Sequence, residues 1–202
     1  MDQKQHWESV YTTKALEEVS WYEEVPTTSL EFLSEAKLPL NAKIIDIGGG
    51  DSLFVDHLLK LGYKDITVLD ISANAIKRAK KRLGNFADKV KWVISDATHF
   101  QPTETYDFWH DRAVFHFITQ EQDISTYLSV IEKGFKENGI LVVGTFSENG
   151  PKKCSGIEIK QYSESELIER FGKFIKVKCL KTNHQTPFNT VQNFTFCSFK
   201  KN

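Results

Sequence analysis

Three acidic side chains in this sequence each stand at the end of a short apolar run, and three glycines follow the first of them. Asp46 lies in the run 44–47, Asp70 closes the run 65–70, and Asp96 comes just after the run 90–94. Glycines directly after a buried strand allow a tight turn and a close approach of the backbone to a ligand. Carboxylates at such strand ends can accept hydrogen bonds from a sugar or a base. The pattern predicts a site for a nucleotide-like ligand.

The residues after the glycines favour a ligand without phosphates. Asp51 would repel a phosphate at the start of the following helix. A Gly-Lys-Ser/Thr ending, which a phosphate-binding loop requires, does not occur here, and Leu53 stands where a dinucleotide fingerprint has its third glycine. S-adenosylmethionine, an adenosine joined to an amino acid through a sulfonium, fits these constraints. The glycine loop alone is equally compatible with a tight structural turn or with another kind of nucleotide site.

The second and third acids supply independent support. Asp70 follows Gly48 by 22 residues, about the spacing at which an α/β nucleotide site places its ribose-binding carboxylate. We expect Asp70 to bind the ribose and Asp96 to accept from the adenine amino group. A single acid at a strand end is more often a helix cap or turn former. Three such strands in succession make that alternative much less probable.

With these motifs in place, the sequence resembles the class I S-adenosylmethionine-dependent methyltransferases. The matching segments are Asp-Ile-Gly-Gly-Gly at 46–50, Leu-Asp-Ile-Ser at 69–72, Ser-Asp-Ala at 95–97 and Tyr-Asp-Phe-Trp at 106–109. Further segments, at 6–11, 20–22, 109–117, 154–156 and 184–187, resemble a group of small bacterial methyltransferases, so that the resemblance covers nearly the whole chain. Ser52 replaces the usual third loop glycine. The cofactor contacts expected are Asp46, Gly48, Gly49, Gly50, Asp70, Ile71, Asp96, Ala97, Asp111, Trp21 and Tyr22.

The densest group of titratable side chains follows the fourth strand-like run. His110 and His116 are candidate bases for an acceptor that arrives protonated. For each histidine, a hydrogen bond to neighbouring backbone is an equally good interpretation. Arg112 is a candidate to hold a substrate carboxylate or to orient the cofactor, and it could also pair with Asp111. Methyl transfer itself mainly requires alignment and the removal of water.

The residues before the first strand are rich in aromatic side chains. Trp7, Tyr11, Trp21 and Tyr22 all lie within the first 28 residues, which we expect to form a lid. The resemblance places this lid over the methionine end of the cofactor, where aromatic faces can stabilise a sulfonium. Whether Trp7 and Tyr11 contact a ligand or only pack is left open, as it is for Cys154 and His184, which could line the acceptor pocket.

Strand-like and helix-like segments alternate along the chain, which is typical of a parallel sheet covered by helices. Helices are expected at 29–36, 53–61, 72–83, 120–136 and 163–172. The helix at 72–83 should have Ser72 as its N-cap and basic residues facing solvent, and Asn138-Gly139 should close the helix at 120–136. Strands are expected at 106–109 and 140–146. Residues 175–199 indicate a hairpin. The expected fold is a doubly wound, seven-stranded, mostly parallel sheet with an antiparallel C-terminal strand and helices on both faces. A nicotinamide-binding domain would more often continue with parallel units.

Composition limits the class of protein. The chain has 202 residues, 26 Lys and Arg against 27 Asp and Glu, and 40% hydrophobic residues. This size and balance predict one domain, 1–202, consisting of a lid at 1–28 and a core at 29–202, and no overall field that would attract nucleic acid. The polar start at 1–8 and the absence of a long apolar run favour a cytoplasmic protein without membrane contact. Three cysteines without Cys-x-x-Cys spacing argue against a disulfide framework or zinc site, and we expect free thiols and no metal.

Taken together, the sequence predicts methyl transfer from S-adenosylmethionine to a small-molecule acceptor. A protein lysine methyltransferase is the first alternative, because the same core can support it. A cofactor-binding protein that no longer catalyses transfer is the second. The Asn/Asp-Pro-Pro-Tyr signature typical of amino methylation of DNA bases and glutamine is absent from 109–112, where Trp-His-Asp-Arg stands.

Overall fold

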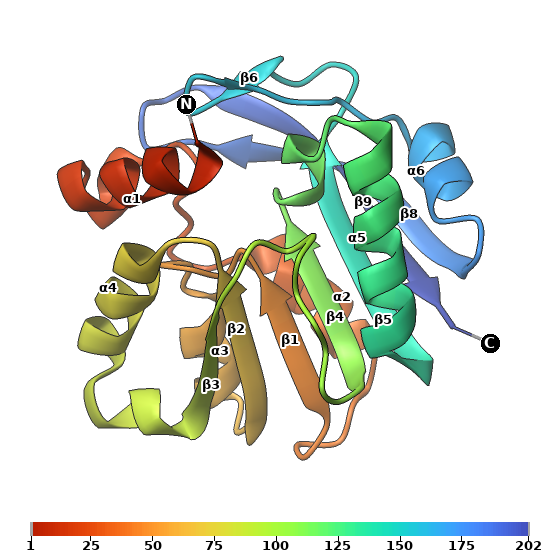
Figure 1. Ribbon diagram of the computed structural model, residues 1–202, viewed down its shortest axis with the longest axis horizontal. Helices are drawn as coiled ribbons and strands as arrows, with labels where there is room; N and C mark the ends of the chain where they lie inside the picture. The colour runs from red at the N-terminus through yellow and green to blue at the C-terminus, as the bar shows by residue number, and fades with distance from the viewer. Residues whose placement is uncertain (1, 202) are drawn as a thin grey trace.

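A seven-stranded sheet forms the centre of the computed structural model, which describes residues 2–201 (Figure 1). Met1 and Asn202, the two ends of the predicted domain, lie outside the described residues. The strands of this sheet are β1 (Lys43–Ile47), β2 (Asp65–Asp70), β3 (Val90–Ile94), β4 (Tyr106–Arg112), β5 (Phe135–Phe146), β8 (Ile175–Gln185) and β9 (Val191–Lys200).

The strands lie in the spatial order β3-β2-β1-β4-β5-β9-β8. The first five strands along the chain run parallel, whereas β9 is antiparallel to both β5 and β8. The predicted fold class, including the antiparallel C-terminal strand, is confirmed. The winding direction reverses between β1 and β4, and in open sheets of this kind the carboxyl ends of the strands beside the reversal form the ligand crevice.

Helices cover both faces of the sheet. Side chains of α2 (Thr27–Glu35) and α3 (Phe54–Lys60) share one apolar cluster with β1, β2 and β4, whereas α5 (Glu121–Gly134) and α6 (Glu164–Arg170) contribute to the cluster on the other face. The helix α4 (Ala73–Leu83) packs against β2 and β3, and α1 (Gln3–Thr13) packs against α4. Figure 1 shows α1 above the end of the sheet at which β1 and β4 terminate.

Short elements complete the described chain. A two-stranded sheet consists of β6 (Lys153–Cys154) and β7 (Ile157–Glu158), joined by Ser155 and Gly156 at positive φ. Single 3₁₀ turns are η1 (Leu16–Glu18), η2 (Gly84–Lys89) and η3 (Phe115–Phe117). Within residues 2–201, no helix is both long enough and apolar enough to cross a membrane.

Local capping residues account for the helix boundaries that the sequence predicted well. Ser72 Oγ accepts from the backbone N–H of Ala75 at 3.1 Å, and α4 ends at Gly84, whose φ of +55° suits glycine. Ser163 and Glu166 form the predicted capping box of α6. In both helices a short polar motif caps the first turn, which is why a local sequence pattern could predict these boundaries.

The junction between α5 and β5 differs from the expectation. The predicted helix 120–136 ends at Gly134, and β5 begins at Phe135 instead of residue 140. Phe135 pairs with Tyr106 and Ile140 pairs with Phe108, so residues 136–139 loop out of the ladder. The fully buried Phe135 ring belongs to the apolar cluster that also contains side chains of α5 and α6. The helical spacing of apolar residues extends to Phe135, so the periodicity placed this residue in the helix, whereas it is the first residue of β5.

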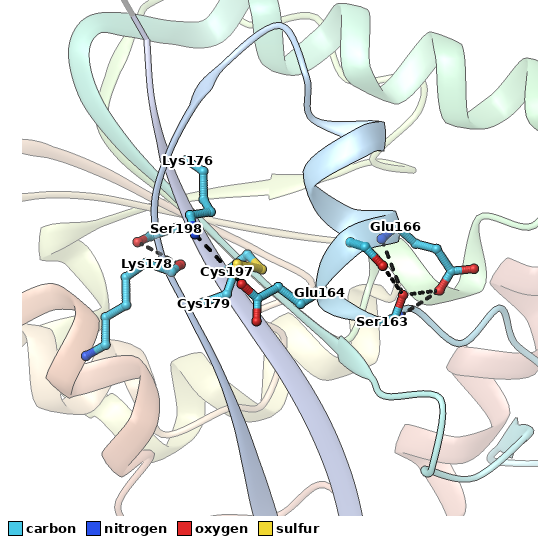
Figure 2. Close-up of a disulfide and its surroundings, with 9 residues drawn as sticks. Ser163, Glu164, Glu166, Lys176, Lys178, Cys179, Cys197 and Ser198 are labelled. Atoms are coloured by element: carbon cyan, nitrogen blue, oxygen red, sulfur yellow. Dashed lines mark hydrogen bonds and ion pairs between the residues drawn. A yellow bond between two sulfur atoms is a disulfide. The ribbon is translucent and has the colours of Figure 1, made fainter.

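The expectation of free thiols is wrong for two of the three cysteines. Cys179 on β8 and Cys197 on β9 form a disulfide, shown in Figure 2. They stand directly opposite each other in the antiparallel register, which brings their side chains together. Spacing rules look for neighbouring cysteines and therefore miss a pair joined across a hairpin. Cys154 is free, as expected, and it is buried.

Candidate active site

A cavity of about 420 Å³ lies at the carboxyl ends of β1 to β4, under the N-terminal segment. Most residues predicted to bind cofactor or acceptor lie on its wall. The predicted residues that line it are Trp21, Tyr22, Asp46, Gly48, Gly49, Asp70, Ile71, Asp96, Ala97, His110 and Arg112. Three predicted residues, Gly50, Asp111 and His116, are not part of the wall.

The loop after β1 depends on its glycines. Gly48 has a φ of +66° and Gly50 a φ of +31°, conformations that favour glycine. A Cβ atom on Gly49 would lie 2.9 Å from Val68 Cγ1 and would also overlap the Asp46 carboxylate. A Cβ on Gly50 would overlap the carboxylate of Asp70. The loop therefore packs its backbone directly against the two acids that flank it, which explains why Gly50 contributes without lining the cavity.

Asp51 is held by two arginines of α4. Arg78 Nη2 lies 2.8 Å from Asp51 Oδ2, and Arg82 contacts the other carboxylate oxygen. Burial nevertheless raises the pKa of Asp51, against the effect of the two guanidinium groups. We expected the basic residues of α4 to fill its solvent face, and for Arg78 and Arg82 that expectation is wrong. They link α4 to the glycine loop.

Asp70 lies at the end of β2, buried beside the loop. Its Oδ1 accepts from the backbone N–H of Ser72 at 2.8 Å. Burial raises the pKa of Asp70 to about 7, and the nearby charges of Asp46, Glu8 and Asp51 add to the rise. A carboxylate that is costly to ionise in the empty cavity gains most from hydroxyl donors. Asp70 lies on the cavity wall, where it can accept hydrogen bonds from ligand hydroxyls.

Asp96 lies after β3 and is more exposed than Asp70. Its Oδ1 accepts from both the backbone N–H and the hydroxyl of Thr98, each at 2.7 Å. Asp96 thus forms the turn that the alternative interpretation of a strand-end acid describes. The carboxylate also lines the cavity, where it can accept from a ligand amino group.

Asp46 belongs to a hydrogen-bonded chain that the sequence did not indicate. The register places Asp46 beside His110 on β4, and Asp46 Oδ1 lies 2.7 Å from His110 Nδ1. His110 Nε2 lies 2.9 Å from the hydroxyl oxygen of Ser29 on α2. Because a carboxylate only accepts, Nδ1 carries a proton when Asp46 is ionised. Asp46 Oδ2 has no hydrogen-bond partner among the described residues. Ser29 was missed because nothing local marks it.

Asp111 and His116 point away from the cavity. Asp111 accepts from the backbone N–H groups of Val114 and Phe115 and from the hydroxyl of Tyr127, at 2.9, 3.2 and 2.6 Å. Burial raises the pKa of Asp111 to about 6. The geometry thus gives Asp111 the role of bracing the turn after β4, in place of the predicted cofactor contact.

His116 is fully buried against Phe117 and Phe146. Its Nδ1 accepts from the backbone N–H of Phe146 at 3.3 Å. Burial and the charge of Arg112 lower the pKa of His116 to about 3, so the imidazole is neutral near pH 7. Its position behind the wall does not support the predicted role of a base, and it matches the alternative of a histidine bonded to backbone.

Arg112 is paired within the protein. Its Nη2 lies 3.2 Å from Glu23 Oε1, and its Nη1 donates to the carbonyl of Trp21 at 3.3 Å. Glu23 in turn binds His184 Nδ1 at 2.9 Å, and His184 Nε2 lies 2.7 Å from the carbonyl of Ser20. Burial alone would raise the pKa of Glu23, but these partners hold that pKa below its usual range. Glu23 was not predicted, because its partners come from distant β4 and β8.

Aromatic rings of the N-terminal segment roof the cavity. The rings of Trp7 and Trp21 meet edge to face at 5.6 Å, and Trp7 meets Phe117 at 5.2 Å. Tyr11 completes the group, 6.3 Å from Trp21. All four line the cavity. Trp7 and Tyr11 thus lie where they can contact a ligand as well as pack, and the action of residues 1–28 as a lid stays a prediction.

The helix α1 is fastened to α4 by charged groups. Glu8 accepts from Ser72 Oγ and from the backbone N–H groups of Ala73 and Asn74, at 2.9, 2.7 and 3.0 Å. Arg78 donates to the carbonyl of Tyr11 at 3.1 Å. A carboxylate at a helix N-terminus satisfies orphan N–H groups and the helix dipole. The helix α1 is therefore bound to α4, the helix whose Arg78 and Arg82 contact Asp51 in the glycine loop.

Cys154 also lies on the wall of the cavity. Burial raises the pKa of the Cys154 thiol to about 12, so the group is an uncharged thiol near pH 7. Within residues 2–201, no group of three or more His, Cys, Asp or Glu side chains is arranged to hold a metal ion.

Comparison with known proteins identifies relatives of this arrangement. A family model described as a methyltransferase domain matches residues 45–141. EEF1A lysine methyltransferase 2 of Mus musculus is 31% identical over 108 residues, which are 47% of this chain and 44% of that protein. Malonyl-[acyl-carrier protein] O-methyltransferase 2 of Ilyobacter polytropus is 27% identical over 107 residues, or 52% of this chain and 40% of that protein. The chain thus matches less than half the length of these two relatives.

Solved structures share the fold over the whole chain. The N-methyltransferase NodS from Bradyrhizobium japonicum, in complex with S-adenosyl-L-homocysteine, superposes with a TM-score of 0.73 at 16% identity, covering 99% of both chains. At this identity the likeness concerns the fold. Its extent includes the N-terminal segment that roofs the cavity.

Proposed function

Because the chain belongs to the class I S-adenosylmethionine-dependent methyltransferases, we propose that it transfers the methyl group of S-adenosylmethionine to a small-molecule acceptor. The observation that carries the proposal is the convergence of Asp46, Asp70 and Asp96 with the glycine loop on one cavity. The loop is unsuited to a phosphate-containing ligand, because Asp51 lies on it and its carboxylate would repel a phosphate.

The cofactor's orientation follows from the wall. Asp70 is proposed to bind the ribose hydroxyls and Asp96 the adenine amino group, with Ile71 and Ala97 beside the adenosine. The amino acid end then lies at the glycine loop beside Asp46, which lines this part of the cavity. The sulfonium lies under Trp21 and its aromatic neighbours, where cation–π attraction favours it. Tyr22 closes the same side.

The size of the cavity supports a small acceptor. At about 420 Å³ it lies toward the lower end of the roughly 300–1,000 Å³ typical of sites for drug-sized ligands. S-adenosylmethionine is itself drug-sized, so little room is left beneath the roof. A protein lysine is the second candidate, favoured by the similarity to EEF1A lysine methyltransferase 2 of Mus musculus. It would require the roof of α1 to open. Loss of catalysis is the remaining alternative.

Transfer is proposed to proceed by alignment and desolvation. His110 is bonded through both ring nitrogens and is assigned to positioning Asp46. Arg112, paired with Glu23, is assigned to orienting the acceptor at its end of the cavity. These roles replace the predicted histidine base, and they require only that the acceptor and the methyl carbon meet in line with water excluded.

The chain 1–202 is proposed to form one methyltransferase domain, to act in the cytoplasm and to have no nucleic-acid or membrane partner. The near balance of charged residues supports the last point. The disulfide between Cys179 and Cys197 weighs against the cytoplasmic part of this proposal, because disulfides are rare in reducing compartments such as the cytosol.

The proposal is tested by incubating the purified protein and S-adenosylmethionine with a metabolite library and measuring release of S-adenosylhomocysteine. Turnover with a small molecule, lost in the Asp70→Ala variant, is expected. Turnover with protein substrates alone would favour the lysine candidate. Cofactor binding without any turnover would favour the non-catalytic alternative.

A further inference from the structure

The part of the cavity beyond β4 has no free group that could accept a proton. If the adenosine lies at Asp70 and the amino acid at the glycine loop, as the proposed function requires, the methyl carbon faces this end. Its wall consists of Trp7, Trp21, Arg112 and Phe117, with Cys154 beside them. The inference below rests on that proposed function.

The charged groups at this end neutralise one another. Glu23 is engaged both by Arg112, at 3.2 Å, and by His184, at 2.9 Å. His184 is engaged at its other nitrogen by the carbonyl of Ser20. A carboxylate held between two donors is a poor base, because protonation would break both contacts. The negative charge of Glu23 also compensates the positive charge of Arg112.

Three further ionisable side chains on the wall, His110, Tyr11 and Cys154, are occupied or stay protonated. His110 is bonded through both ring nitrogens, to Asp46 and to Ser29. Burial raises the pKa of the Cys154 thiol to about 12 and that of the Tyr11 phenol well above its usual value, so both are uncharged near pH 7. The Cys154 thiol and the Tyr11 phenol therefore add no charge to this surface near pH 7.

We propose that the acceptor is a small molecule that enters this cavity as an anion, with its nucleophilic sulfur or oxygen already deprotonated in solution. A lone pair on that atom attacks the methyl carbon while the bond from the methyl carbon to the sulfonium breaks. The electron pair of the broken bond becomes a lone pair on the cofactor sulfur. The products are a methyl thioether or methyl ester and S-adenosylhomocysteine, and no proton is transferred.

The apolar roof favours such an acceptor over an amine. Attack of an anion on a sulfonium removes two opposite charges, so the transition state carries less charge than the separated reactants. Aromatic walls that exclude water strengthen the attraction between the two ions. A neutral amine would instead yield a cationic product in the same enclosure, and an ammonium would first have to lose a proton that neither Glu23, His110, Tyr11 nor Cys154 is free to take.

The test is a pH profile with acceptors of graded acidity. The full chain is assayed from pH 6 to 9 for S-adenosylhomocysteine release with small thiols of different pKa, small carboxylates, and primary amines that include a lysine peptide. For thiols, kcat/KM should rise about tenfold per pH unit up to the pKa of each thiol, and the inflection should move with the thiol. Turnover of carboxylates would instead be level over this range. The two arms thus distinguish a sulfur from an oxygen acceptor.

Two variants separate a protein base from the acceptor's own ionisation. Glu23→Gln and His110→Asn should leave the inflection of a given thiol in place, whatever their effect on the rate. An inflection at one fixed pH for all acceptors, or its loss in either variant, would overturn the proposal. Preferred methylation of amines would do so too.

Calorimetry with S-adenosylhomocysteine, made first, keeps the two claims apart. Without cofactor binding, the proposed function fails. With binding but no turnover of any anionic acceptor in the panel, the proposed function can stand and this inference is wrong.

Discussion

Asp70→Asn should stabilise the unliganded protein at alkaline pH while weakening its affinity for the cofactor. The substitution keeps the shape of the side chain and leaves an oxygen that can accept from the backbone N–H of Ser72, as Asp70 does at 2.8 Å. It removes the charge that burial makes costly. The carboxylate therefore lowers stability in the empty protein, and ligand donors offset that loss.

The magnitude follows from the pKa. Burial raises the pKa of Asp70 from 3.8 to about 7, which at about 1.4 kcal/mol per unit amounts to about 4 kcal/mol at pH 8. Because the folded-state pKa is the higher one, the stability from this group is fully present below about pH 4 and is lost as pH rises to about 7. The advantage of Asp70→Asn should thus grow by roughly 2 to 3 kcal/mol between pH 5 and pH 8.

Urea unfolding at pH 5, 6, 7 and 8 measures the stability, and calorimetry with S-adenosylhomocysteine measures the affinity. The variant should lose about 1.5 to 3 kcal/mol of binding, or roughly 10- to 150-fold, the range for a hydrogen bond to a charged group. Binding to the parent near pH 7 should also release protons, because hydroxyl donors lower the pKa of Asp70.

Asp111→Asn is the matched control. Asp111 is also a buried acid with a raised pKa, of about 6, but it lies behind the cavity wall. Its replacement should change stability with pH and leave cofactor affinity unchanged. If Asp70→Asn were less stable than the parent at pH 8, or bound cofactor as tightly, the reasoning about burial and ligand donors would be refuted.

Three other substitutions test the loop, the roof and the hairpin. Gly49→Ala should abolish cofactor binding and cost about 1 to 3 kcal/mol in urea unfolding, because its methyl group would overlap Asp46 and lie 2.9 Å from Val68; normal binding would show that the loop can move. Glu8→Gln should weaken the attachment of α1 by about 1 kcal/mol and speed cofactor release about fivefold in stopped-flow displacement, whereas the exposed Glu17→Gln should not; equal rates in both would mean that α1 does not limit release. Cys179→Ser should lower the free energy of unfolding by about 3 kcal/mol, the entropy of closing a loop of this length, and reductant should destabilise the parent but not the variant; a parent indifferent to reductant would contradict the disulfide.

Features encoded within a few consecutive residues were predictable. The glycine loop, the acid at the end of β2 and the caps at Ser72 and Ser163 each depend on a local motif, and they lie where the sequence placed them. The antiparallel hairpin was predictable for the same reason, since alternation and a turn occur within one segment. Local sequence is sufficient to predict these features, and the tertiary packing agrees with them.

Contacts between distant segments were not predictable. The carboxylate of Asp46 meets His110, and the Glu8 carboxylate meets α4, only through the spatial order of the strands and the docking of α1. The disulfide depends on a register that pairs Cys179 with Cys197, and no spacing rule reports it. The choice between a base and a histidine bonded to backbone stayed open for His116, because a sequence does not show whether a side chain faces the cavity or the core.

The central claim is that this cavity binds S-adenosylmethionine, and titration calorimetry tests it most directly. The protein should release heat on titration with S-adenosylhomocysteine and with S-adenosylmethionine, at one site per chain, without added metal, and the heat should diminish strongly in Asp70→Asn. No heat with either ligand, together with measurable binding of NAD, would contradict the account.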